Sequence, residues 1–344
     1  MAEKETVTIA AIIACRCFGV VIAVSEGMIN FVEPEFITMK KACRILMAAL
    51  VPLTALAWPG PSGRVYPERN DDLAWENDLV AFRAYGPATQ RNGERAFGYD
   101  LFLKYPDKGP VLERLYAAQT SARNWAVVDS LRKTDPDRAR EFERSFTYHV
   151  DHGYGMDCFA VGPTLGCGTA ALLAGDSICY PWCYRSVEIL ENGPERFMAR
   201  LTFAPQVIEG DTVTETRVIT LDEGSHLNRC EVSYEGLSRE REVVAGFPIR
   251  SDGPWMADAA NGILAVTDPT QGADNGEIYL GLVFRTQPCD TVTLDGHRLL
   301  KTTIRPGETF CYDWGYAWSR GDIPGFSEWA DRLSAYRKAI NGTD

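Results

Sequence analysis

The sequence lacks the short signatures of several large enzyme classes. It contains no glycine-rich phosphate loop, no GxSxG nucleophile elbow and no HExxH metal motif. These absences remove most of the support for a nucleotide-dependent enzyme or a serine hydrolase. No two cysteines have the CxxC spacing, so a structural zinc site of the ribbon type is not indicated. The composition, with 45% hydrophobic and 24% charged residues, is that of a globular protein with a sizeable core.

No apolar run is long and uninterrupted enough to predict a membrane span, which needs about 20 residues. Residues 39–57 instead combine a basic start at Met39, a short apolar stretch and a small-residue cleavage site after Ala57, which predicts a signal peptide. The earlier apolar run is interrupted by Arg16, a costly residue in a bilayer. We therefore expect residues 1–38 to be a mis-assigned upstream extension, and the protein to be periplasmic or secreted.

Positive charge is in short supply. Lysine and arginine total 35 against 47 aspartates and glutamates, a net charge of −12. Residues 1–57 contain five residues of each sign, so the mature chain keeps this charge. An acidic chain argues against nucleic acid as a partner. The net charge does not exclude an anionic oligosaccharide as a partner, because a few arginines in a cleft can bind it locally. No membrane partner is expected after signal cleavage, and the oligomeric state stays open.

Seven cysteines follow residue 57. An odd number leaves at least one free thiol in an oxidising compartment. Cys179 and Cys183 are close enough in sequence to form a disulfide, and no other pairing is indicated.

Short β-strand patterns dominate the chain after residue 150. Helices are expected only within residues 110–146, where Asp135 could cap a helix that begins at Pro136, and at residues 326–340. Many short strands without alternating helices predict a mainly β protein, a large antiparallel β-sandwich forming one domain over residues 58–344. The expected strands are residues 79–85, 186–190, 197–203, 212–221, 228–234, 278–284 and 291–294.

The densest polar segment is residues 148–157. His149 and His152, with Asp157, could bind a divalent metal such as zinc or calcium. Alternatively, His152 or Tyr154 could transfer protons. The plain alternative is a polar loop whose histidines are satisfied by hydrogen bonds.

Two aromatic clusters could contact a sugar. Trp182, Tyr184 and Arg185 combine rings that can stack on a pyranose with a guanidinium that can bind a carboxylate. Trp314 and Trp318, within residues 312–320, could form the wall of a ligand site. The alternative for both clusters is an ordinary sandwich core with surface arginines.

Several of these segments together resemble a family known as domain of unknown function 4861. The resemblance implies a supersandwich of the galactose-mutarotase-like kind in polysaccharide-degrading bacteria. It also implies a link to dehydratases that act on uronic-acid oligosaccharides such as those of ulvan. The matching segments are residues 75–78, 81–88, 149–153, 155–158, 161–166, 192–194, 314–318 and Asp322.

The implied reaction removes water across C4–C5 of a non-reducing-end uronic acid. The C5 proton is weakly acidic until a positive charge neutralises the neighbouring carboxylate. We expect Arg83 or Arg185 to bind that carboxylate, while His149, His152 and Tyr184 share the proton transfers. The residues expected to bind the rest of the substrate are Trp75, Tyr85, Tyr154, Trp182, Arg250, Trp314 and Trp318.

Three other functions stay open. A polysaccharide lyase would use the same proton abstraction but expel a sugar. A glycoside hydrolase would need paired carboxylates, and Glu76, Asp78, Asp151 and Asp157 form no obvious pair. A sugar-binding module would keep the aromatic residues and need no histidine. His226 is a further, isolated candidate for proton transfer or metal binding.

Overall fold

The computed structural model describes residues 12–14, 21–23, 58–285 and 289–342. The chain divides into two compact units, Met1–Leu56 and Ala57–Asp344. In the first unit, β1 (Ile12–Ala14) pairs antiparallel with β2 (Val21–Ala23). The expected signal peptide, and the rest of the expected extension, lie outside the described residues. Among the helices described, none combines the length and the apolar character that a membrane span requires.

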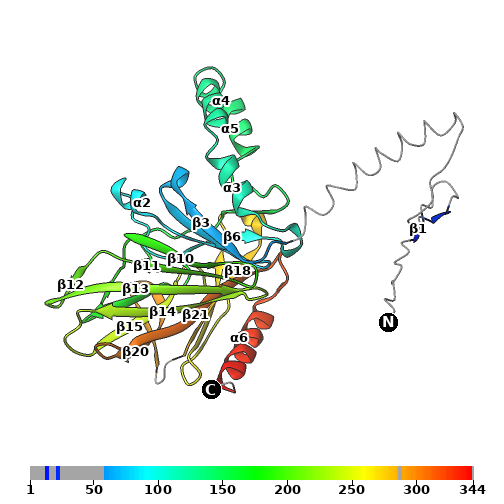
Figure 1. Cartoon of the computed structure of the whole chain (residues 1–344). Helices are drawn as coiled ribbons and strands as arrows, with labels where there is room; N and C mark the ends of the chain where they lie inside the picture. The colour runs from blue at the N-terminus through cyan, green and yellow to red at the C-terminus, as the bar shows by residue number, and fades with distance from the viewer. Residues whose placement is uncertain (1–11, 15–20, 24–57, 286–288, 343–344) are drawn as a thin grey trace, which may run out of the picture. The chain divides into compact units, whose positions relative to one another are not determined.

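Three antiparallel sheets build the second unit (Figure 1). The largest has the strand order β10-β11-β13-β14-β21-β18-β17-β16, with β12 paired to β13. The second has the order β19-β20-β15-β8-β9, and the third has the order β3-β4-β5-β6-β7. The expected mainly β, antiparallel sandwich is therefore confirmed.

The strand bounds follow the predicted patterns closely. All of the strands predicted after residue 150 are present, whereas the predicted strand at residues 79–85 is the second arm of a hairpin whose first arm was not predicted. That hairpin consists of β4 (Asp72–Glu76) and β5 (Ala81–Ala84). The third sheet also contains β3 (Ser62–Tyr66), β6 (Asp100–Lys104) and β7 (Gly155–Met156). The largest sheet contains β10 (Ser186–Asn192), β11 (Arg196–Thr202), β12 (Gln206–Ile208), β13 (Asp211–Asp222), β14 (Leu227–Glu235), β16 (Trp255–Asp258), β17 (Ile263–Pro269), β18 (Glu277–Phe284) and β21 (Thr309–Trp318). The second sheet contains β8 (Ala170–Ala174), β9 (Ser177–Cys179), β15 (Arg241–Pro248), β19 (Asp290–Leu294) and β20 (His297–Ile304).

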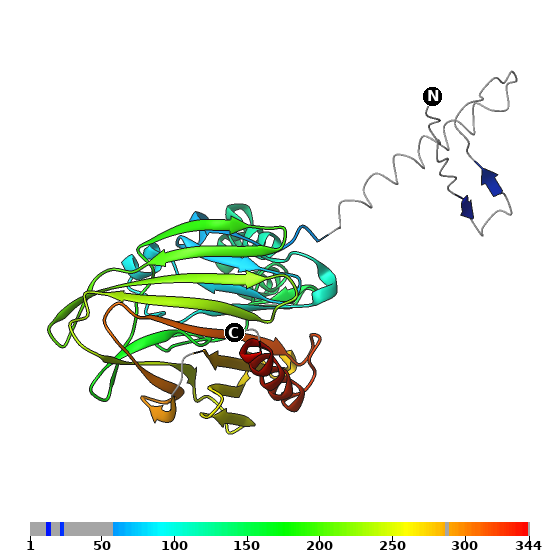
Figure 2. The same ribbon diagram turned by 60° about the horizontal axis from the view of Figure 1, so that its bottom comes forward.

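Strand β21 is buried on both faces: successive side chains point to opposite sides of the sheet, and each side packs against a different core cluster. Trp314 and Trp318 point into the main core, and Ala317 lies on the other face. On that second face the strand is covered by α6 (Phe326–Asn341), which confirms the predicted C-terminal helix and lies against the sheet in Figure 2.

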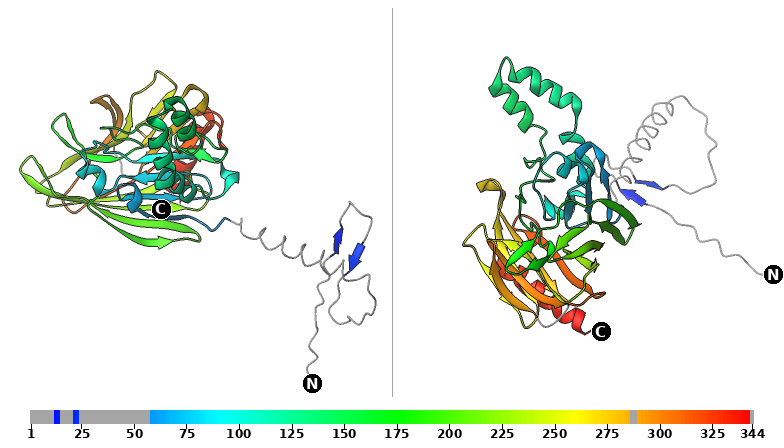
Figure 3. Two further views of the ribbon diagram at one scale, coloured as in Figure 1. Left: turned by 90° about the horizontal axis from the view of Figure 1, so that it is seen from above. Right: turned by 90° about the vertical axis from the view of Figure 1, so that its left-hand side faces the viewer.

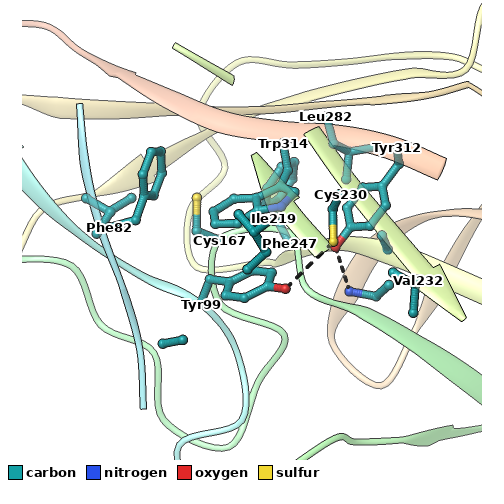
Figure 4. Packing of buried hydrophobic residues seen from close by; sticks show 14 of the residues in the cluster. Phe82, Tyr99, Cys167, Ile219, Cys230, Val232, Phe247, Leu282, Tyr312 and Trp314 are labelled. Atoms are coloured by element: carbon teal, nitrogen blue, oxygen red, sulfur yellow. Dashed lines mark hydrogen bonds between the residues drawn. The ribbon is translucent and has the colours of Figure 1, made fainter. Parts of the chain in front are cut away.

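Aromatic side chains join the third sheet to the largest sheet. Trp314 stacks on Tyr99 with ring centroids 4.1 Å apart and meets Phe82 edge-on at 5.0 Å (Figure 4). Trp75 is fully buried, and its Nε1 donates to Asn228 Oδ1 at 2.8 Å. Trp75 and Trp314, expected to contact substrate, are therefore core residues. Their rings are inaccessible to a sugar.

Glu76 links the helical segment to the third sheet. Its carboxylate accepts hydrogen bonds from the backbone N–H groups of Val111 and Leu112, at 3.0 Å each, where helix α3 (Leu112–Gln119) begins. Lys104 Nζ donates to the same carboxylate at 2.8 Å, and both side chains are at most 4% exposed. A carboxylate at a helix N-terminus satisfies orphan N–H groups and complements the helix dipole. Glu76 is thus a structural residue.

The helices predicted within residues 110–146 are present. They are α3 (Leu112–Gln119), α4 (Ala122–Arg132) and α5 (Pro136–Arg144). Asp135 caps α5 as expected, accepting the N–H of Arg138 at 3.1 Å. Figures 1 and 3 show α4 and α5 as a hairpin projecting from the sheets.

The disulfide that the sequence allowed is not formed. Cys179 and Cys183 are both free thiols. Cys183 is buried, and burial raises its pKa to about 12, so it is an unreactive thiol.

Candidate functional site

The loop of residues 148–157 is tightly anchored to the third sheet. Asp157 N donates to Tyr148 O at 2.7 Å, which closes the loop at its base. Gly155 pairs with Lys104 in β6, at a φ of 137°. A Cβ at this position would come within 2.1 Å of Leu103 O, so only glycine fits there. The loop is therefore held in one conformation by backbone contacts.

A buried charge cluster lies beneath the loop. The Arg83 guanidinium donates to Asp100 and, at 3.0 Å, to Asp157 Oδ2. A third carboxylate, on Asp72, lies 3.8 Å away. Arg83 is only 3% exposed and also contacts the hydroxyl of Tyr85 at 3.4 Å.

Burial raises the pKa of two carboxyls in this cluster. The pKa of Asp157 is raised to about 6, and that of Asp72 to about 6, because desolvation outweighs the attraction of Arg83. Strongly perturbed groups occur both at functional sites and in structural ion networks. Because the Arg83 side chain is only 3% exposed, we assign this cluster to a structural ion network. Arg83 is not available to a substrate carboxylate, and Tyr85, buried with its hydroxyl on Asp100 at 2.5 Å, is likewise internal.

His149 is the exposed histidine of the loop. Its side chain is 53% exposed, and its Nδ1 lies 2.9 Å from the backbone oxygen of Asp157. A carbonyl oxygen can only accept, so Nδ1 carries the proton and the neutral ring keeps its lone pair on Nε2. Within the described residues no hydrogen bond to Nε2 is found. His149 therefore presents an available base to solvent.

His152 has the opposite arrangement. Its Nε2 lies 3.0 Å from Thr147 O, so Nε2 donates and Nδ1 holds the lone pair. Tyr154 lies next to it, with rings 6.2 Å apart, and Arg114 lies 4.6 Å above the Tyr154 ring. Tyr154 is thus engaged by α3.

The expected metal ligands do not form a ligand set. Asp157 is buried and bound by Arg83 at 3.0 Å, so its carboxylate is not free to join His149 and His152 as a third ligand. Over residues 58–285 and 289–342, no group of three or more histidine, cysteine, aspartate or glutamate side chains is placed to hold a metal ion. These three residues therefore do not fit the expected zinc or calcium site.

Two residues that the sequence analysis did not select as site residues, Tyr105 and Arg320, meet at Asp151 in the loop. Tyr105, just after β6, donates from its hydroxyl to Asp151 Oδ2 at 2.8 Å. Arg320, just after β21, reaches the same oxygen at 3.4 Å and is 43% exposed. Trp318 completes the group, 4.8 Å from the Tyr105 ring and 5.3 Å from the Arg320 guanidinium. Trp318 is 2% exposed, so it supports this cluster from the core.

Burial, with the hydrogen bond to Asp151, raises the pKa of Tyr105 to about 12. Tyr105 therefore keeps its proton at neutral pH. Tyr105, Asp151 and Arg320 bring together a protonated phenol, a carboxylate and a cation. Asp151 belongs to the same loop as His149, and we call these four residues the loop site.

The cluster of residues 182–185 lies apart from the loop site. Tyr184 is buried, donates to Asp71 O, and has a pKa raised by burial. Trp182 is 37% exposed, and Arg185 is exposed. No hydrogen bond, ion pair or ring contact joins Trp182, Tyr184 or Arg185 to His149 or His152 in the part of the chain that the structure describes. The structure thus brings Tyr184 into no direct contact with the histidines with which it was expected to share proton transfers, and its buried hydroxyl is already bound to Asp71 O.

Two other candidates are held elsewhere. Arg250 pairs with Asp268 at 3.2 Å and donates to Val161 O at 3.2 Å, so it is a structural contact of β17. His226 is buried and pairs with Asp322 at 3.0 Å, beneath α6.

Known proteins provide the remaining comparison. A family model described as "Domain of unknown function (DUF4861)" matches residues 44–342. A protein of Formosa agariphila named "Uncharacterized protein P7" is 31% identical over 180 residues, covering 50% of this chain and 40% of that protein, so the chain spans less than half of its relative. The structure of the GH36 α-galactosidase AgaB of Geobacillus stearothermophilus is similar with a TM-score of 0.31 and 12% sequence identity. The match covers 74% of this chain and 41% of that one. A similarity this weak says nothing about function. Since the family model covers most of the sequence, the chain belongs to the family described as domain of unknown function (DUF4861).

Proposed function

We propose that this protein is a carbohydrate-active enzyme that eliminates water across C4–C5 of a non-reducing-end uronic acid. One observation carries the proposal. A half-exposed arginine and a protonated tyrosine, Arg320 and Tyr105, converge on Asp151 in the loop that also presents the Nε2 lone pair of His149. These are the groups that β-elimination from a uronate needs, and the family resemblance supports the same chemistry.

Arg320 would bind the uronate carboxylate. Its guanidinium pairs with Asp151 and donates to the backbone oxygen of Asp274, each at 3.4 Å, but the side chain remains 43% exposed, so donors are left for a ligand. Neutralising the carboxylate stabilises the negative charge that develops when the C5 proton leaves. Arg320 thus replaces Arg83 and Arg185 in the role that the sequence analysis had given them.

The proton transfers follow from the protonation states. His149 Nε2 would take the C5 proton, while the Tyr105 hydroxyl would give its proton to the departing C4 oxygen. The C4–O bond breaks, water leaves, and a C4=C5 double bond forms. Return of the proton from the imidazolium of His149 to the phenolate of Tyr105 restores the enzyme, so the net reaction consumes nothing except the substrate.

The test is an elimination assay on saturated uronate oligosaccharides, followed by enoate absorbance and product mass. We expect the wild type to give new absorbance with loss of one water and no shortening. His149→Ala, Tyr105→Phe and Arg320→Gln should each lower turnover by roughly 100-fold or more, the usual scale for losing a proton-transfer or charge-stabilising group.

Arg305→Gln is the matched control, because Arg305 is 78% exposed and pairs with Glu240 away from the loop. It should keep wild-type turnover. Shortened products would identify a polysaccharide lyase instead. Unchanged turnover in both His149→Ala and Tyr105→Phe would remove the loop site from the reaction.

A further inference from the structure

A surface pocket outside the loop site is lined by arginines and by no acidic residue. Its volume is about 350 Å³, and its polar lining comes from Gln90, Arg91, Tyr184 and Arg185. The chain as a whole has a net charge of −12. A cationic pocket on such an acidic protein attracts an anion locally, against the overall field.

The two arginines of this pocket differ in how far they are neutralised. Arg91 pairs with Asp71 at 3.0 Å, and Tyr184 donates to the backbone oxygen of the same Asp71, which fixes this side of the pocket. Arg185 makes no ion pair within the described part of the chain. Its backbone N donates to Thr202 O at 2.8 Å, so the main chain holds it at the start of β10. The main chain of Arg185 is therefore fixed, and its exposed guanidinium has no carboxylate partner among the described residues.

An exposed aromatic ring continues the pocket. Trp182 is 37% exposed and meets Phe97 edge-on at 5.6 Å. A small adjoining pocket is lined by Trp182 and shares Cys183 and Tyr184 with the arginine-lined one. An indole face beside guanidinium donors matches a pyranose ring that carries an anionic group.

We propose that this pocket is a second binding site, for the carboxylate or sulfate group of an anionic saccharide. Arg185 supplies the charge, Arg91 and Gln90 supply further hydrogen-bond donors, and Trp182 stacks on the ring. The oxyanion site stands on the pocket alone, whereas the saccharide class rests on the proposed function. Because no contact links this pocket to the loop site among the described residues, it would bind a part of the oligosaccharide that does not react.

The test is titration of the full mature chain with D-glucuronate and, separately, with sodium sulfate. Binding is followed by the shift in Tm and by tryptophan fluorescence, against sodium chloride at equal ionic strength. We expect saturable binding to the wild type and an affinity at least tenfold lower in Arg185→Gln. Trp182→Phe should remove the fluorescence change on glucuronate binding. Binding of glucuronate alone would identify a carboxylate site, and binding of sulfate alone would identify a sulfate site.

The side chain of Arg185 is exposed, so its substitution should not disturb folding. Arg305→Gln is again the control and should bind as the wild type does. Equal affinity in Arg185→Gln and wild type, or no saturable binding of either probe to the wild type, would overturn the proposal. Elimination activity on a uronate disaccharide, measured in parallel, separates the two proposals. Absence of elimination in every protein, with binding that depends on Arg185, would reject the dehydratase and retain the second site.

Discussion

At the scale of single residues, the arginines predicted to contact substrate differ mainly in what neutralises them. Arg83 is enclosed by three carboxylates, and Arg250 is paired with the buried Asp268. Arg185 has no ion-pair partner in the part of the chain described. A guanidinium can bind a ligand carboxylate only where its donors are exposed and unspent. By that criterion Arg185 is available, Arg320 keeps exposed donors although it pairs with Asp151, and Arg83 is not available.

The Asp268–Arg250 pair predicts a pH dependence of stability. Asp268 is 1% exposed, and burial raises its pKa to about 6, although Arg250 opposes the shift. Between about pH 4 and pH 6 the folded protein therefore keeps a proton that the unfolded chain has lost. The contribution of Asp268 to the free energy of unfolding is largest below about pH 4 and is lost as the pH rises through 6.

Asp268→Asn removes this titration, so the stability of the wild type relative to the variant should fall by about 2 kcal/mol from pH 4 to pH 7. Denaturant unfolding of both proteins at several pH values measures the difference, in which contributions from other groups cancel. A difference that stays constant across this range would contradict the raised pKa.

At the scale of elements, the side chains of the segment Trp75–Asp78 join several separate parts of the fold. Trp75 and Glu76 connect the third sheet to β14 and to α3, respectively. Asn77 donates to the backbone oxygens of Asp222 and Ser225 at 2.7 Å, and Asp78 accepts from Gly224 N at 2.7 Å. These four side chains hold a hairpin, a helix and a distant turn together. A glycoside-hydrolase carboxylate pair built from Glu76 and Asp78 is not supported, because both are occupied.

The buried Glu76–Lys104 ion pair predicts that removing one of its two charges lowers stability. Glu76→Gln leaves the Lys104 ammonium buried without its counter-charge, which should lower the free energy of unfolding by about 3 kcal/mol or more. The double variant Glu76→Gln/Lys104→Met removes both charges and should recover much of the loss. Denaturant unfolding of the wild type, both single variants and the double variant gives the coupling energy. Strictly additive losses would show that the pair is not coupled.

At the scale of the whole molecule, residues of all three sheets share one buried core, so we expect the sheets to unfold as one cooperative unit. Trp314 in β21 contacts Phe82 of the third sheet and Tyr99, which directly precedes β6. Losing a fully buried tryptophan creates a cavity and costs about 3–5 kcal/mol. Trp314→Ala should therefore lower the stability of all three sheets together.

Circular dichroism and tryptophan fluorescence should report one shared transition for Trp314→Ala, shifted to lower denaturant. Trp255→Ala is the matched control, since Trp255 is 49% exposed, and it should change stability by less than about 1 kcal/mol. Two separated transitions in Trp314→Ala would show that the third sheet folds independently.

Much of the fold was predictable, and less of the site was. Alternating and helical patterns depend on local residue order, so β13, β14, β18, α5 and α6 were expected at nearly their observed bounds. The first arm of the β4–β5 hairpin was missed because its residues are buried on both faces, which removes the alternation that marks a strand.

The loop site shows where prediction from sequence stops. Residue chemistry identified the segment of His149 and the tryptophan-rich strand that ends near Arg320. It did not pair them, because Tyr105, Asp151 and Arg320 are far apart along the chain and meet only when β6 and β21 lie in their sheets. A pattern of residue types carries no information on such long-range contacts.

The sequence by itself determined the class of the fold, the family, the acidic charge and the positions of most strands and helices, since these depend on composition and local periodicity. Only the tertiary structure decided which polar groups are usable. Four of the predicted site residues are buried and make only internal contacts: Arg83, Trp75, Trp314 and Tyr184. By contrast, the side chains of His149, Arg320 and Arg185 are exposed. The exposure of a side chain and the neutralisation of its charge depend on neighbours that are distant in sequence, so only the tertiary structure determines them.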